Sequence, residues 1–307
     1  MTTTITQTPT DRLSLVRLAE AHYNHELVKV CHERINDISW PANATKPMTL
    51  LLQEPMASNQ IASICFILAM TSINYRFWQL LPNGSLVRYH HLGKSGARAL
   101  WSAFEAAWGM SPNHGTELSK RLHAGEFTIL FGDMPDRQGR LDILSEILEP
   151  EKLPMVAEIL FNELRSSKRV TVTQAAGLAM LFPLAFDDPF LKKAQLALSM
   201  VAAYLRSNEF EIDVSDLTAF SDYQVPRVMR ALGVIEYSPS LADMVDQCLL
   251  LEEGGPEEQA IRAATITACE AIAKHTGGTA ADIDNLLWLS QDIAEEARFH
   301  LTETRLY

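Results

Sequence analysis

Dense runs of Lys and Arg are missing from this sequence. It holds 26 basic residues against 38 acidic ones, for a formal net charge of −12, and its densest basic group is Arg165 with Lys168 and Arg169. Proteins that bind long nucleic acids need basic patches to neutralise phosphates. A long nucleic acid is therefore not expected as a partner, whereas a small anion held by one or two local cations is compatible with this charge.

Cysteine pairs and long apolar segments are also missing. The four cysteines are widely separated and form no Cys-x-x-Cys pair, so neither a zinc cage nor a disulfide framework is indicated. The longest apolar stretch, residues 61–70, is too short and too mixed to span a bilayer. The first ten residues lack the charged and apolar regions of a signal peptide. We expect a cytoplasmic protein with no membrane contact, no metal and no cofactor.

No linker rich in Gly, Ser or Pro and no block of charge divides the chain. Residues 1–10 are rich in Thr and are predicted to form a disordered tail. Residues 11–307 are predicted to form a single domain, which we expect to be a monomer or a weak homodimer.

Helical periodicity dominates the rest of the sequence. A first helix is predicted from Asp11 to about Ile35, and a buried one near 58–70. The single β signal is a hairpin, in which residues 73–78 and 86–89 flank the turn sequence Pro82-Asn83-Gly84-Ser85. The fold class is thus all-α with one small hairpin. Further helices are predicted near 97–108, 115–123, 137–148, 153–166, 173–182, 189–206, 226–232, 240–251, 256–274 and 280–300.

The most specific pattern lies in the C-terminal third. The segment FSDYQVPR at 220–227 is followed by LGVIEYS at 232–238, EEQAIRA at 257–263, DNLLW at 284–288 and a last stretch from Phe299-His300 to Tyr307. Upstream lie INYRFW at 73–78 and FLKKAQ at 190–195, with a weaker match at Arg140. In order and spacing, residues 60–307 resemble the queuosine salvage proteins.

This resemblance implies a helical fold related to the DNA glycosylases. It also implies hydrolysis of queuosine 5′-monophosphate to queuine and ribose 5-phosphate without a metal. By position, Asp222 matches the catalytic aspartate of the family and Lys192 matches its active-site lysine. The substrate-binding residues that we expect are Asn74, Phe77, Trp78, Phe220, Tyr223, Arg262, Asp284, Trp288 and His300.

Four positions depart from the family pattern. Thr71 stands where the family usually has Asp, Arg98 lies where aromatic residues are usual, and Gly139 and Ala260 replace acidic residues. These changes leave the presumed catalytic residues intact, so they concern the identity of the base more than the type of reaction.

Cleavage of an N-glycosidic bond builds positive charge on C1′ and O4′ of the ribose, which a carboxylate beneath the sugar stabilises. A 7-deazapurine has no N7 to protonate. Electrostatic stabilisation of the sugar must therefore supply more of the reduction in the activation barrier. Asp222 suits that role. Lys192 could hold the aspartate ionised or bind the 5′-phosphate, and the Lys192-Lys193 pair supports a phosphorylated substrate.

Structural readings of the same residues remain open. Asp222 could cap the helix that contains Pro226, and Lys192 could lie on a solvated helix face. Phe77, Trp78 and Trp288 could be core residues, Arg262 and Asp284 could pair with each other, and His300 could be exposed near the chain end. Two other functions also remain: an N-glycosidase for another modified or deazapurine nucleotide, and a catalytically inactive helical protein that binds nucleotides.

Overall fold

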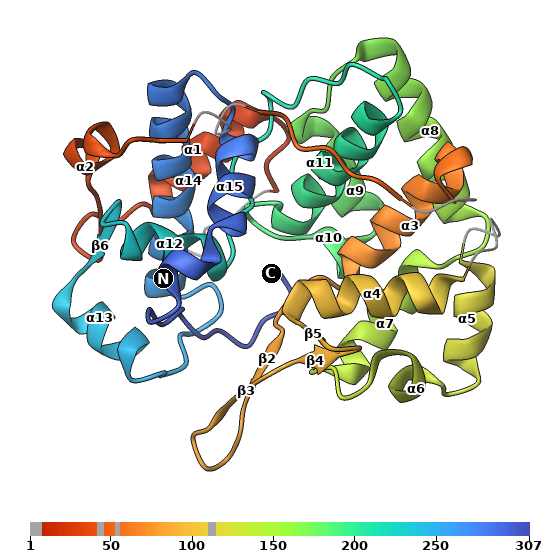
Figure 1. Ribbon diagram of the computed structural model, residues 1–307, viewed down its shortest axis with the longest axis horizontal. Coiled ribbons are helices and arrows are strands. Elements are labelled where there is room, and N and C mark those ends of the chain that lie inside the picture. The colour runs from red at the N-terminus through yellow and green to blue at the C-terminus, as the bar shows by residue number, and fades with distance from the viewer. Residues whose placement is uncertain (1–7, 42–45, 53–55, 110–114) are drawn as a thin grey trace.

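The computed structural model describes residues 8–41, 46–52, 56–109 and 115–307, most of which are helical (Figure 1). The helices are α1 (Arg12–His22), α2 (His32–Asp37), α3 (Gln60–Ser72), α4 (Gly96–Trp108), α5 (Thr116–His123), α6 (Phe127–Phe131), α7 (Arg137–Ile147), α8 (Lys152–Ser167), α9 (Val172–Leu181), α10 (Pro183–Phe186), α11 (Lys192–Ser207), α12 (Gln224–Ala231), α13 (Pro239–Asp246), α14 (Pro256–Thr276) and α15 (Ala280–Leu289), with 3-10 turns η2 (Met56–Ser58) and η3 (Gln291–Ala294). The strands are β1 (Val28–Val30), β2 (Trp78–Leu80), β3 (Leu86–Arg88), β4 (His90–His91), β5 (Lys94–Ser95) and β6 (Ile235–Tyr237). The predicted all-α class is confirmed.

The helices form two groups, seen side by side in Figure 1. Helices α3 to α11 make up one group, in which α3 packs against α8 and α11. The other contains α1, α2 and α12 to α15, and its centre is α14, which packs against α1 and α15. The last residues of the chain run between the two groups.

Helix α3 shows why the core forms where it does. Its sequence is apolar on nearly every side, and every residue from Ala62 to Ser72 is buried. A helix that is apolar all round is stable only when other elements surround it. The Asn59 side chain accepts the N–H of Ala62 and so caps the first turn.

The predicted hairpin is present as the β2–β3 pair, in which Trp78 faces Arg88 and Leu80 faces Leu86. Its first strand is Trp78–Leu80, so the prediction of that strand over residues 73–78 is wrong except at Trp78. Gly84 in the turn has a φ of 81°, which a glycine adopts at little cost. Two further two-stranded sheets were not predicted. They pair β4 with β5 directly after the hairpin, and β1 with the distant β6.

The predicted single helix over residues 11–35 is wrong. Helix α1 ends at His22, and Val28–Val30 forms a strand that pairs with Ile235–Tyr237. Val28 and Val30 are buried while Lys29 between them is exposed, which is the period-two pattern of a strand. A partner some two hundred residues away decides this conformation, so local periodicity did not reveal it.

Two C-terminal helices are shorter than predicted. The helix expected over 240–251 ends at Asp246, and that expected over 280–300 ends at Leu289 and continues only as the short turn η3. The segment after η3 forms no further helix and runs between the two groups of helices. Four of its residues are buried: Phe299, His300, Leu301 and Tyr307. The predictions near 97–108, 115–123, 137–148, 153–166 and 173–182 agree with α4, α5, α7, α8 and α9 within a few residues.

Most of the predicted N-terminal tail, residues 1–7, lies outside the described residues. Of the remaining tail residues, Thr8 donates its hydroxyl to Asp187 Oδ1 at 3.3 Å. Within the described ranges, no helix combines the length and the apolar character that crossing a bilayer requires.

Candidate active site

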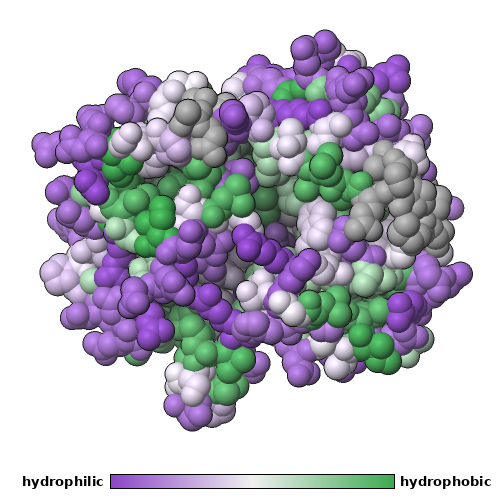
Figure 2. All heavy atoms as spheres, in the orientation of Figure 1, coloured by the Kyte–Doolittle hydropathy of each residue, from purple (hydrophilic) through white to green (hydrophobic). Residues whose placement is uncertain are grey.

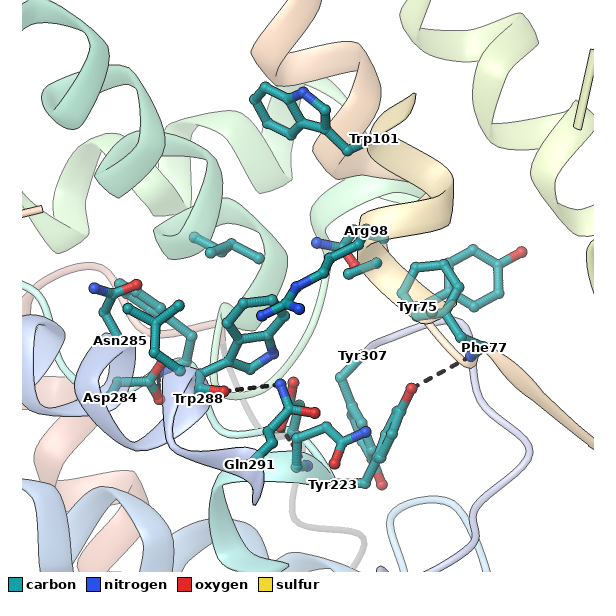
Figure 3. A pocket seen from close by; sticks show the side chains of 18 of the residues that line it. Tyr75, Phe77, Arg98, Trp101, Tyr223, Asp284, Asn285, Trp288, Gln291 and Tyr307 are labelled. Carbon is teal, nitrogen blue, oxygen red and sulfur yellow. Dashed lines mark hydrogen bonds between the residues drawn. The ribbon is translucent and has the colours of Figure 1, made fainter. Parts of the chain in front are cut away.

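A cavity of about 930 Å³ lies between the two groups of helices. Hairpin β2–β3 and the start of α4 form one wall, residues from α12, α15 and η3 form the opposite wall, and α11 begins between them. Figure 2 shows the surface hollowed between the two groups, and Figure 3 shows side chains from both walls pointing into the space. Nine of the predicted site residues line this cavity: Asn74, Phe77, Trp78, Lys192, Phe220, Asp222, Tyr223, Asp284 and Trp288.

Asp222 lies just before α12 and is 8% exposed. Its Oδ1 accepts the backbone N–H groups of Gln224 at 2.7 Å and Val225 at 3.2 Å, so it caps the helix as the structural reading requires. Its Oδ2 lies 3.8 Å from Lys192 Nζ. The cap therefore does not compete with a chemical role, because it fixes one oxygen and leaves the second beside the ammonium group.

Lys192 is the first residue of α11, and its backbone N–H donates to Asp188 Oδ2 at 2.7 Å. It is 4% exposed, which excludes the solvated reading. Its Nζ also lies 3.5 Å from the backbone oxygen of Asn74, to which it donates. Burial lowers the pKa of this ammonium group, while the nearby Asp222 carboxylate opposes that effect.

Lys193 points elsewhere. Its Nζ donates to the backbone oxygen of Ser72 at 2.9 Å and lies 4.9 Å from the centre of the Tyr75 ring. It is absent from the cavity lining. The expected joint action of Lys192 and Lys193 on a phosphate therefore has no support in this geometry.

Asp284 is a second buried carboxyl in the cavity wall. Its Oδ1 accepts the backbone N–H of Phe220 at 3.0 Å, which ties α15 to the segment that carries Asp222. Burial raises the pKa of Asp284 to about 8, and the nearby charge of Asp222 adds to the effect. The Phe220 N–H and Lys192 oppose it only in part. Near neutral pH this wall therefore presents mainly a protonated carboxyl beside Asp222.

Arg262 lies behind the cavity wall rather than in it. Its Nη1 and Nη2 donate to the two carboxylate oxygens of Asp188 at 2.9 Å and 2.8 Å, and both side chains are 1% exposed. Its Nε donates to the backbone oxygen of Ser221 at 3.2 Å. Asp188 holds the N–H of Lys192, and Ser221 precedes Asp222, so this one guanidinium group positions both members of the pair. The alternative pairing of Arg262 with Asp284 does not occur.

The aromatic residues both line the cavity and form part of the core. Trp78 is 2% exposed and packs against Phe299 with ring centroids 6.5 Å apart. Phe77 stacks on Tyr89 at 6.2 Å, and Tyr223 packs against Phe299 at 4.9 Å. Across the space, Trp288 projects from α15 (Figure 3). Phe77 and Trp78 each pack against another aromatic ring, and each presents part of its surface to the cavity.

His300 is fully enclosed instead of exposed, and it does not line the cavity. Its Nε2 lies 3.3 Å from the hydroxyl of Tyr307. Burial, with the charge of Arg262, lowers the pKa of His300 to about 3, so the ring is neutral at ordinary pH. It contacts Tyr307, which does line the cavity.

Of the four departures from the family pattern, Arg98 lines the cavity, whereas Thr71, Gly139 and Ala260 do not. The hydroxyl of Thr71 donates to the backbone oxygen of Ile67 inside α3. A side chain at position 139 would collide with Asp136 and Arg305. Thr71, Gly139 and Ala260 therefore lie in helices outside the cavity lining, and only the change at Arg98 alters the cavity surface directly.

Sequence reasoning missed several residues of the site. Arg88, Lys94, Trp101 and Tyr307 line the cavity, and Asp188 anchors the layer beneath it. Asp188 could have been found, because it stands four residues before Lys192, the first residue of α11. The others come from separate elements, and no local spacing unites them.

Comparison with known proteins places these residues in a family context. Residues 188–307 match the family model described as queuosine salvage protein. A Sphaerobacter thermophilus protein named queuosine 5′-phosphate N-glycosylase/hydrolase is 34% identical over 127 residues, which cover 38% of this chain and 39% of that protein.

Two relatives of the same name come from Dictyostelium discoideum and Schizosaccharomyces pombe. The first is 26% identical over 251 residues, which cover 73% of this chain and 71% of the relative. The second is 29% identical over 111 residues, which cover 34% of this chain and 31% of the relative. These matches confirm the resemblance seen in the motifs, and the family model spans Lys192, Asp222, Arg262 and Asp284.

Proposed function

We propose that this chain, whose residues 188–307 belong to the queuosine salvage protein family, hydrolyses the N-glycosidic bond of queuosine 5′-monophosphate. The products are queuine and ribose 5-phosphate. One observation carries the proposal: a buried Asp222–Lys192 pair opens into a cavity between two groups of helices. The volume of about 930 Å³ lies within the range of small-molecule sites.

In the proposed reaction the C1′–N bond breaks, and its electrons leave with the base. Positive charge then spreads over C1′ and O4′, and the Asp222 carboxylate faces it from the cavity wall. A water molecule forms the new C1′–O bond, and the base takes up a proton. The Asp222 side chain is largely buried, and a fixed charge in such a position is worth more than in bulk water.

The surroundings keep the carboxylate in place before the substrate arrives. Two backbone N–H groups hold Oδ1, and the ammonium of Lys192 lies beside Oδ2. Arg262 fixes Ser221 and Asp188 on either side of this pair. A charge that is already oriented needs no reorganisation during the reaction, and that is the main source of electrostatic catalysis.

Two alternatives keep the same cavity. One is an N-glycosidase for another modified or deazapurine nucleotide, which would use the same Asp222–Lys192 pair. The other is a nucleotide-binding protein without catalysis, which the presence of both Asp222 and Lys192 disfavours. A cytoplasmic location and a monomeric or weakly dimeric state remain predictions, and light scattering over a concentration series tests the second.

The direct experiment incubates the purified protein with queuosine 5′-monophosphate and measures free queuine and ribose 5-phosphate by chromatography. Stoichiometric appearance of both products supports the proposal. Release of a base from a different deazapurine nucleotide only would favour the first alternative. Saturable binding without product would favour the second.

A further inference from the structure

One wall of the cavity carries three cationic side chains. Arg88 from β3, Lys94 from β5 and Arg98 from α4 line it, and all three are exposed. Among the ion pairs of the described residues, none involves any of the three. In a chain with a net charge of −12, three unpaired cations around one cavity create a local attraction for an anion.

Local contacts bring the three groups toward a common space. Lys94 Nζ donates to Ser102 Oγ at 2.5 Å, and Ser102 lies one turn after Arg98 on the same face of α4. Arg88 places its guanidinium carbon 5.3 Å from the centre of the Phe299 ring, and Phe299 also lines the cavity. Figure 3 shows Arg98 reaching from α4 into the cavity toward Trp288.

The other cations near the site already have partners. Lys192 faces Asp222, Lys193 donates to Ser72, and Arg262 is bound to Asp188. Those groups hold the protein together around the reaction centre, so their charges are not available to an incoming dianion.

We propose that Arg98, together with Lys94 and Arg88, forms the subsite for the 5′-phosphate of the nucleotide. The inference rests on the proposed function, which places the ribose next to Asp222. A guanidinium group can donate two parallel hydrogen bonds to a phosphate, and an ammonium adds a compact charge beside it. The proposal depends on the three cationic side chains, and the N-terminal end of α4 at the same wall adds a partial positive charge.

The test compares wild type with Arg98→Gln and Arg98→Lys. The kinetic readout is the ratio of kcat/KM for queuosine 5′-monophosphate to kcat/KM for the nucleoside queuosine. Loss of one charged hydrogen-bonding group should lower this ratio roughly ten- to a hundredfold in Arg98→Gln, and Arg98→Lys should recover part of it. Arg17→Gln, which changes an exposed arginine of α1, is the matched control and should leave the ratio unchanged.

Binding of ribose 5-phosphate, with ribose as the uncharged reference, supplies a readout that does not depend on turnover. Weaker binding of ribose 5-phosphate to Arg98→Gln, with circular dichroism unchanged, supports the subsite. If wild type releases queuine but Arg98→Gln lowers kcat/KM equally for the nucleotide and the nucleoside, the subsite is wrong while the proposed function stands. If no nucleotide is cleaved but Arg98 controls ribose 5-phosphate binding, the phosphate site stands and the proposed function fails.

Discussion

Replacing Asp284 with Asn should change how the stability of this protein depends on pH. Asp284 is 4% exposed, and burial beside Asp222 raises its pKa to about 8 in the fold, against 3.8 for an ordinary aspartate. Asn keeps an oxygen that can accept the Phe220 N–H at 3.0 Å. The substitution therefore removes the titration while it preserves the hydrogen bond.

The sign follows from where the proton is bound. Below about pH 4 the carboxyl is protonated in both the folded and the unfolded chain, and no difference arises. Between 3.8 and about 8 the unfolded chain releases the proton while the folded protein keeps it, so the free energy of unfolding falls as pH rises. Each pH unit is worth about 1.4 kcal/mol, so an upper limit for the whole window is roughly 6 kcal/mol.

The assay is urea denaturation of wild type and Asp284→Asn at about pH 4.5 and about pH 8. The variant should gain stability relative to wild type by on the order of 3 kcal/mol between the two conditions. Any fixed cost of burying the Asn amide cancels, because only the change with pH is compared. Asp243→Asn, on the exposed face of α13, is the control. Equal differences between Asp284→Asn and wild type at both pH values would refute the reasoning.

Three further outcomes follow from the same geometry. Lys192→Met, which removes the ammonium 3.8 Å from Asp222 Oδ2, should lower kcat at least about tenfold in a steady-state assay; an unchanged kcat would exclude its electrostatic role. Arg262→Met leaves Asp188 buried without its partner, and the free energy of unfolding should fall by about 3–5 kcal/mol in a denaturant titration; a loss below about 1 kcal/mol would contradict the buried pair. In a competition among queuosine, simpler deazaguanine and ordinary purine monophosphates, wild type and Arg98→Gln should rank the three nucleotides alike, because Arg98 is assigned to the phosphate that all three carry; a changed ranking would place Arg98 against the base instead.

The sequence revealed those parts of the fold that depend on near neighbours. The hairpin was found because the turn sequence around Gly84 lies between two short apolar runs, although its first strand begins only at Trp78. Strand β1 escaped because Val28 and Val30 owe their conformation to β6, far along the chain. A local pattern cannot distinguish a helix from a strand when the deciding partner is remote.

The candidate site, too, could be predicted from the sequence only in part. Motif resemblance pointed to Asp222 and Lys192, and the fold brings them together. The resemblance could not identify Asp188 as a partner of Arg262, because the two residues lie 74 positions apart and their pairing depends on tertiary packing. Equally, Arg88 and Arg98 become neighbours of one cavity only after the hairpin and α4 have folded around it.

Single-turnover release of queuine from queuosine 5′-monophosphate, measured for wild type and Asp222→Asn, tests the central claim most directly. Asn keeps the size of the side chain and an oxygen that can accept the N–H groups of Gln224 and Val225, so the helix cap survives while the negative charge is lost. The account predicts release by wild type and a loss of more than about a hundredfold in the variant, with unchanged circular dichroism. Release by Asp222→Asn at a rate near that of wild type would contradict it.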